Sequence, residues 1–364
     1  MYKIIKKDIN DFFIKYYNDY YKDNNLIYDN MQVFREIIIL IYKKLGNYIA
    51  NNNEQINWDR IEKSTFIEYI PLIEKFYKKL NIDTDINKLI ENGTINLYPK
   101  STEELEETKK QGKSLNGTNK YQKGHKVVDV YNNGLITDSI TLVHEISHYR
   151  NQPDIKRNQV NNLFTEALAF AEEFIYLDYL KSMGYEYETN IIKNKVTETF
   201  FFIAADTYPL VKLHLLFRKL GEISEENYIY LFKYNDYKDI VGVLKDIINE
   251  QNNNITNFDK DILNNKEIMD KLNDNFISDI MYILAAPLSI YMYEEFKKDN
   301  NFINNIKLLN DTLMNNNTND KTVVECLNII GLSNYNEESL NKISESFKNY
   351  INELEEAKKP TRVK

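Results

Sequence analysis

Residues that break helices are rare in this chain, and this constrains its fold more than any other feature of the sequence. The 364 residues contain 10 glycines and 6 prolines, fewer than the roughly 7% and 5% of an average protein. Apolar residues also recur three and four positions apart over long stretches, for example at Val33, Ile37 and Ile41, which is the period of an amphipathic helix. We therefore expect a mainly α-helical fold, with helices over about 8–80 and again over 139–354.

A small β-sheet is expected between these two helical regions. Thr94–Tyr98 is a short apolar run ended by Pro99, and Val127–Tyr131 is rich in β-branched residues and is followed by an Asn-Asn-Gly turn. The stretch 112–124 contains three of the ten glycines and is predicted to be a loop. The positions of these turns and loops suggest three parts: an N-terminal helical lobe over 1–93, a catalytic core over 94–300, and C-terminal helices over 301–364 that pack on the core.

Charge, apolar stretches and cysteine content indicate the cellular compartment of the protein and the classes of partner it binds. The formal net charge is −9, whereas a nucleic-acid binder normally shows a basic face. The longest apolar stretches found in the sequence, over 36–42 and 200–217, are too short or are interrupted by charges, so no membrane span is expected. A single cysteine, Cys326, fits a reducing compartment. We expect a cytoplasmic protein with neither nucleic acid nor a membrane as partner.

One short segment carries residues suited to metal chemistry. The run His144-Glu145-Ile146-Ser147-His148 contains two of the four histidines in the chain. On a helix, positions i and i+4 lie on one face, so both imidazoles can reach one metal ion. Glu145 lies beside the metal in this arrangement and can take a proton from water bound there. The segment predicts a metal site with His144 and His148 as ligands and Glu145 as general base.

A catalytic zinc site needs a third protein ligand and one open position. Downstream, Glu166 and Glu173 are seven residues apart and share one helix face, whereas Glu172 points elsewhere. Glu166 follows His148 by eighteen residues, which leaves room for a turn and an antiparallel return. We assign Glu166 as the third ligand and Glu173 as a carboxylate that orients a ligand histidine, and expect Glu172 to be solvated. Two imidazoles and a carboxylate without a thiolate suit Zn²⁺, one ion per chain.

These residues resemble the thimet oligopeptidase and oligoendopeptidase F family of zinc metallopeptidases, which are gluzincins. The family pattern is His-Glu-x-Gly-His, followed by a helix with a ligand Glu and another Glu seven residues later. Asn96–Lys100 is similar to the Asp-Leu-Tyr-Pro-Arg of the oligoendopeptidase F branch, and Asn151–Pro153 to its short linker after the motif. The resemblance covers roughly 94–295. The chain departs from the pattern at Ser147, where the family has glycine.

The resemblance implies a multi-helical, zincin-like metallopeptidase with a small sheet next to the active-site helix. Family members also use a histidine and tyrosines downstream of the motif to stabilise the oxyanion of the transition state. The matching region here has no histidine but contains Tyr282, followed by Tyr291 and Tyr293. The resemblance therefore suggests Tyr282 as the oxyanion donor.

The leading hypothesis is a zinc-dependent endopeptidase or oligopeptidase that hydrolyses peptide or oligopeptide substrates, with Glu145 as general base. The strand Val127–Tyr131 is expected to be an edge strand that pairs with the extended substrate backbone. Two alternatives remain open at this point. One is a carboxypeptidase or a protease with a single target that uses the same site. The other is a non-catalytic helical protein that binds a metal or a peptide.

Overall fold

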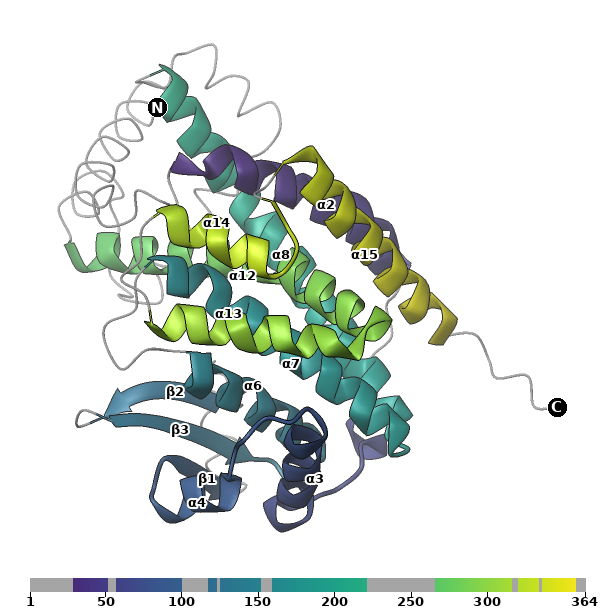
Figure 1. The fold of residues 1–364 in the computed structure, drawn as a ribbon. Coiled ribbons are helices and arrows are strands. Elements are labelled where there is room, and N and C mark those ends of the chain that lie inside the picture. The colour runs from purple at the N-terminus through teal and green to yellow at the C-terminus, as the bar shows by residue number, and fades with distance from the viewer. Residues whose placement is uncertain are drawn as a thin grey trace, which may run out of the picture. The chain divides into compact units, whose positions relative to one another are not determined.

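The computed structural model is mainly helical and contains one small β-sheet (Figure 1), which confirms the expected fold class at this coarse level. The structure describes residues 29–51, 57–99, 117–122, 125–151, 159–220, 266–315, 320–333 and 336–357. The α-helices are α2 (Met31–Ala50), α3 (Phe66–Lys79), α4 (Ile86–Glu91), α6 (Thr137–Asn151), α7 (Gln159–Ser182), α8 (Glu186–Leu220), α12 (Lys266–Lys298), α13 (Ile303–Asn315), α14 (Asp320–Ile329) and α15 (Glu337–Ala357). The strands are β1 (Ile95–Pro99), β2 (Gly117–Gln122) and β3 (His125–Asn132), and two short 3-10 helices are η1 (Trp58–Arg60) and η2 (Asn300–Phe302).

The described residues fall into two compact units. One unit contains those within 1–46 and 199–284, and the other contains those within 47–198 and 285–364. The sheet and helices α6 and α7 all belong to the second unit. The three parts expected from the sequence, 1–93, 94–300 and 301–364, follow different limits and stay a prediction.

The sheet has the order β1-β3-β2, so β3 is its central strand. β1 runs parallel to β3, with Ile95 opposite Val128, and β2 runs antiparallel to β3, with Gln122 opposite His125. Two expectations are therefore wrong. Residues 117–122 form a strand rather than part of a loop, because pairing with β3 satisfies the backbone of a segment whose side chains show no apolar alternation. Val127–Tyr131 is not an edge strand, because both of its edges already carry a neighbouring strand.

Helix α6 lies across β3 and β2 and is packed along its length against α7 (Figure 1). Its side chains Leu142, Val143 and Ile146 are completely buried, as the apolar pattern of the motif segment indicates. On β3, the side chains of Val128 and Val130 are also completely buried. The motif helix is thus held between the sheet and α7, and α13 packs on both helices.

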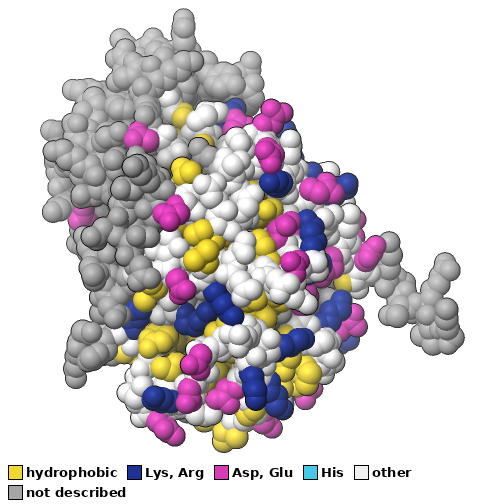
Figure 2. All heavy atoms as spheres, viewed as in Figure 1, with side chains coloured by type: hydrophobic (Ala, Val, Ile, Leu, Met, Phe, Trp, Pro, Cys, Tyr) yellow, Lys and Arg dark blue, Asp and Glu magenta, His cyan; other side chains and the backbone are white. Residues whose placement is uncertain are grey.

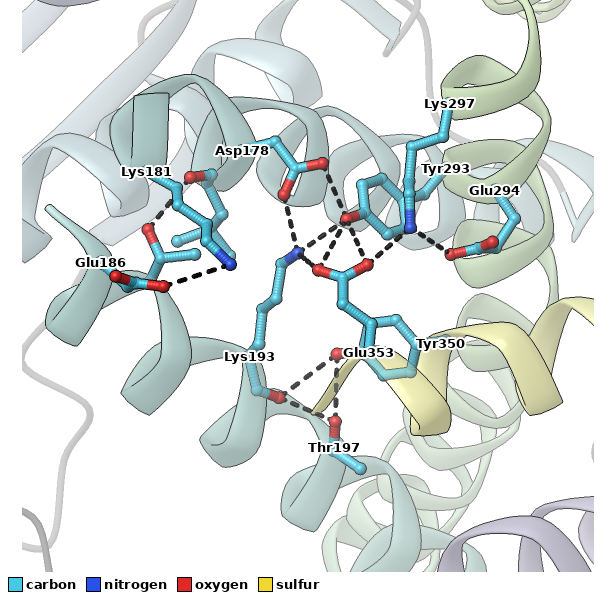
Figure 3. A network of polar contacts seen from close by, with 12 residues as sticks. Asp178, Lys181, Glu186, Lys193, Thr197, Tyr293, Glu294, Lys297, Tyr350 and Glu353 are labelled. Atoms are coloured by element: carbon cyan, nitrogen blue, oxygen red, sulfur yellow. Dashed lines mark hydrogen bonds and ion pairs between the residues drawn. The ribbon is translucent and has the colours of Figure 1, made fainter. Parts of the chain in front are cut away.

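A buried lysine joins four helices of the second unit (Figure 3). The ammonium of Lys193 on α8 is 1% exposed and donates hydrogen bonds to Asp178 on α7 (2.8 Å), to Glu353 on α15 (2.7 Å) and to the hydroxyl of Tyr293 on α12 (2.6 Å). Tyr293 in turn donates to the second carboxylate oxygen of Asp178 (2.8 Å). Buried charges persist only when they are paired and hydrogen-bonded, and this network meets that requirement. It ties the C-terminal helix to the helix that carries Glu166 and Glu173.

Helix α12 contains the one described segment, Phe276–Lys298, that is long and apolar enough to cross a membrane by length and composition. Its apolar window is 72% buried within the protein, which is typical of the core helix of a globular protein. On the face drawn in Figure 2, the described acidic and basic side chains are interspersed. Cys326 on α14 is completely buried, and burial raises the pKa of its thiol to about 12, so the group is unreactive near neutral pH.

Replacing Glu353 with Gln should destabilise the protein by about 2 kcal/mol at pH 7, because Lys193 would then lose one of its two carboxylate partners. Burial raises the pKa of Glu353, but Lys193 and Lys297 outweigh burial and hold it at about 2. A carboxylate with a depressed pKa stabilises the folded state above its unfolded pKa of about 4.3, and this contribution disappears as the pH falls toward 2. Urea unfolding at a series of pH values should show a smaller loss of stability over this range for E353Q than for the wild type.

The control is Glu345→Gln on the same helix. Glu345 forms an exposed ion pair with Lys348, so its replacement should change the free energy of unfolding by less than about 0.5 kcal/mol. Equal effects of the two substitutions would contradict a stabilising role for the buried network.

Candidate metal centre

The turn between β3 and α6 sets the start of the motif helix. The carboxylate of Asp138, in the first turn of α6, accepts hydrogen bonds from the backbone amides of Asn133 (2.7 Å) and Leu135 (3.2 Å). The same side chain accepts a bond of 2.9 Å from the side-chain amide of Asn133. These bonds hold the turn after β3 against the first turn of α6, and so fix where the motif helix begins relative to the strand.

The two histidines of the motif face each other. The Nε2 atoms of His144 and His148 are 3.0 Å apart, and the ring centroids are 4.7 Å apart with the planes at 82°. This is the arrangement expected for positions i and i+4 on one helix face. Both rings therefore present a nitrogen toward the same point.

Glu166 on α7 completes a group of three potential ligands. Its carboxylate oxygens lie 3.5 Å from Nε2 of His144 and 3.4 Å from Nε2 of His148. One ligating atom from each of the three residues lies within 4.8 Å of the others. A tetrahedral zinc ion with bonds of about 2.0–2.1 Å separates its ligand atoms by about 3.4 Å. The spacing in the structure is close to this value, and the donor set of two imidazoles and one carboxylate fits such an ion.

Glu173 lies against the other side of His144, as its seven-residue spacing from Glu166 predicts. Its carboxylate oxygen is 3.0 Å from Nδ1 of His144. A carboxylate accepts a proton from Nδ1–H, and in the neutral imidazole this leaves the lone pair on Nε2, facing Glu166 and His148. Phe170 contacts the same ring edge-on, at 4.8 Å between centroids. Together these contacts fix the orientation of His144.

Burial and charge make this group suited to a cation. Burial raises the pKa of Glu166, but His148 and His144 outweigh burial and hold it well below its usual range. Burial lowers the pKa of His144, but Glu166 and Glu173 outweigh burial and raise it well above its usual range. Nδ1 of His148 and one oxygen of Glu166 are buried without a hydrogen-bond partner among the described residues. Such a cluster of polar atoms is costly to bury unless a positive charge holds it together.

Glu145 is on α6, next to His144, and is 8% exposed. It is not one of the three residues whose ligating atoms converge. A position beside the ligands, rather than among them, is the one that a general base requires.

The structure contradicts the expectation for Glu172. This side chain is completely buried rather than solvated, and both of its oxygens accept hydrogen bonds from Nη1 of Arg150, at 2.8 and 2.9 Å. Helix periodicity predicts the direction in which Glu172 points from α7, but it does not predict which part of the protein packs there. In the structure, the C-terminal end of α6 covers this side chain. The sequence held one signal for this contact: Arg150 is the only Lys or Arg on α6, so it was the one residue of that helix able to pair with the charge of Glu172.

The downstream tyrosines have different surroundings. Tyr282 is on α12, in the unit that contains 199–284, and its role as oxyanion donor stays a prediction. The hydroxyl of Tyr293 accepts a hydrogen bond from Lys193 and donates one to Asp178. Tyr291 is buried, and burial raises the pKa of its hydroxyl to about 12.

Comparisons of the chain with protein-family models, with curated proteins and with solved structures give no match. The resemblance to zinc metallopeptidases therefore rests on the motif residues of the sequence alone.

Substitutions of Glu166 and of Glu173 should lower the affinity for zinc to different degrees. Glu166→Gln removes a ligand charge and should abolish stoichiometric binding, whereas Glu173→Gln leaves all three ligands and should weaken binding about 10–100-fold. Competition with a chromophoric chelator measures both affinities. Glu186→Gln, at an exposed position at the start of α8, is the control and should bind as the wild type does. Equal affinities of E173Q and the wild type would contradict an orienting role for Glu173.

Proposed function

We propose that this chain is a zinc-dependent peptidase that cleaves internal bonds of peptides or oligopeptides. The observation that carries the proposal is the convergence of His144, His148 and Glu166, with Glu145 adjacent on the same helix. A purely structural metal site has no use for a buried carboxylate that is next to the ligands but not one of them. This feature favours a hydrolytic site over a structural one.

The residues have distinct tasks in this mechanism. His144, His148 and Glu166 would hold the zinc ion, which, when bound, polarises the scissile carbonyl and lowers the pKa of a water molecule. Glu145 accepts the proton of the attacking water and delivers it to the amine that leaves. Glu173 holds the ring of His144 in place through Nδ1, so that Nε2 keeps its direction.

The sheet suggests where a peptide substrate lies. β2 pairs with β3 along one edge only, among the strands that the structure describes, and α6 packs against β2 as well as against β3. An extended peptide can therefore add to β2 as a further strand near the motif helix. Main-chain hydrogen bonds then provide affinity without reading the substrate's side chains.

Glu145→Gln should leave zinc binding intact and slow peptide cleavage by about 10²–10⁴-fold, because the variant keeps the ligands but loses the proton acceptor. The zinc-loaded wild type and E145Q are incubated with a diverse peptide mixture, and the products are identified by mass spectrometry. Cleavage at equal rates by both proteins would refute the proposal. The products also distinguish internal cuts from release of single C-terminal residues.

Tyr282→Phe tests the oxyanion assignment. Loss of one such donor typically lowers kcat by about 10²–10³-fold, and KM should change little because the bond strengthens only in the transition state. Steady-state kinetics on one peptide identified in the digest measures both constants. An unchanged kcat would remove Tyr282 from the mechanism.

A further inference from the structure

We propose that Arg150 and Glu172 form a clamp that fixes the register of α7 against α6, and so positions Glu166 and Glu173 around the metal. The inference rests on the proposed metal site. It assigns a role to two residues outside the ligand set, one at the end of the motif helix and one between the two functional glutamates of α7.

The contact between the two residues is short and almost sealed from solvent. Nη1 of Arg150 lies 2.8 and 2.9 Å from the two carboxylate oxygens of Glu172. The side chain of Glu172 is 0% exposed and that of Arg150 is 18% exposed. Because the side chain of Glu172 has no access to solvent, its charge is stabilised by Arg150 rather than by water, and this favours one relative placement of the two helices.

A third helix holds the arginine in place. The ring of Tyr77 on α3 is completely buried, and its centroid lies 5.7 Å from the guanidinium carbon of Arg150. The hydroxyl of Tyr77 donates to the carbonyl of Val143 (3.4 Å), the residue before His144. The same tyrosine therefore contacts both ends of the segment that contains the two histidines.

The sequence of α7 shows why register needs to be fixed. Glu172 and Glu173 are adjacent, so a displacement of α7 by one residue would place Glu172 where Glu173 now meets His144. The same displacement would move Thr165 into the position of Glu166 and remove the third ligand. Pairing Glu172 with Arg150 excludes this alternative, because only one of the two adjacent carboxylates can reach the arginine.

Stability alone is a poor explanation for this pair. Removing two charges from water costs about as much as their attraction returns, so replacing a buried ion pair with apolar residues is often neutral for stability. A directional pair does, however, restrict geometry more than apolar contacts do. The clamp thus predicts an effect on the metal site that is separable from an effect on folding.

The test uses Co²⁺ as a probe that reports both affinity and ligand geometry through its visible absorption. The full-length wild type is compared with Glu172→Gln and with the double variant R150M/E172M, in which no unpaired charge stays buried. Glu353→Gln is the control, because it breaks another ion pair of the same unit, between Lys193 and Glu353, and neither residue is adjacent in sequence to His144, His148 or Glu166. Circular dichroism and urea unfolding establish how far each variant is folded.

We expect tetrahedral absorption from the wild type and from E353Q. E172Q and R150M/E172M should bind Co²⁺ about tenfold more weakly, as groups that orient metal ligands do, and their absorption bands should shift. If E172Q does not fold, the metal affinity and spectrum of R150M/E172M test the clamp instead. A folded double variant with wild-type affinity and spectrum would overturn the clamp and leave the proposed function intact. A folded wild type that binds neither Co²⁺ nor Zn²⁺ would overturn the proposed function, and the clamp with it.

Discussion

The packing of α6 against α7 is the interaction on which the rest of this structure depends. It brings two histidines of one helix and two glutamates of the other into one buried cluster. Burying imidazoles and carboxylates is costly unless they are paired, and in the observed register both Glu166 and Glu173 lie against an imidazole. Arg150 with Glu172, and Phe170 against the ring of His144, provide contacts that distinguish this register from its neighbours.

The elements around these two helices hold them from several sides. The sheet supports α6 through β3 and β2, and Asp138 closes the turn that leads into the helix. Lys193 binds Asp178 near the end of α7 and connects it to the C-terminal helix through Glu353. The convergence of His144, His148 and Glu166 is therefore set by helices rather than by loops.

Much of the site follows from helix periodicity. The four-residue spacing of His144 and His148 and the seven-residue spacing of Glu166 and Glu173 place each pair on one face, and the structure has both pairs so placed. The environment of Glu172 could not be predicted in this way. A helical wheel shows where a side chain points, but whether solvent or an arginine lies there depends on a segment twenty-two residues away.

The sequence by itself determined the mainly helical class, the positions of β1 and β3, and the three residues of the His-His-Glu group, because these depend on local periodicity and on residue chemistry. Only the tertiary structure decided that 117–122 forms a strand and that β3 is central, because a polar segment becomes a strand when a partner satisfies its backbone. It also decided that Glu172 is buried and that Tyr293 belongs to the network of Lys193. These outcomes depend on which elements meet, and residues that meet are often far apart in the chain.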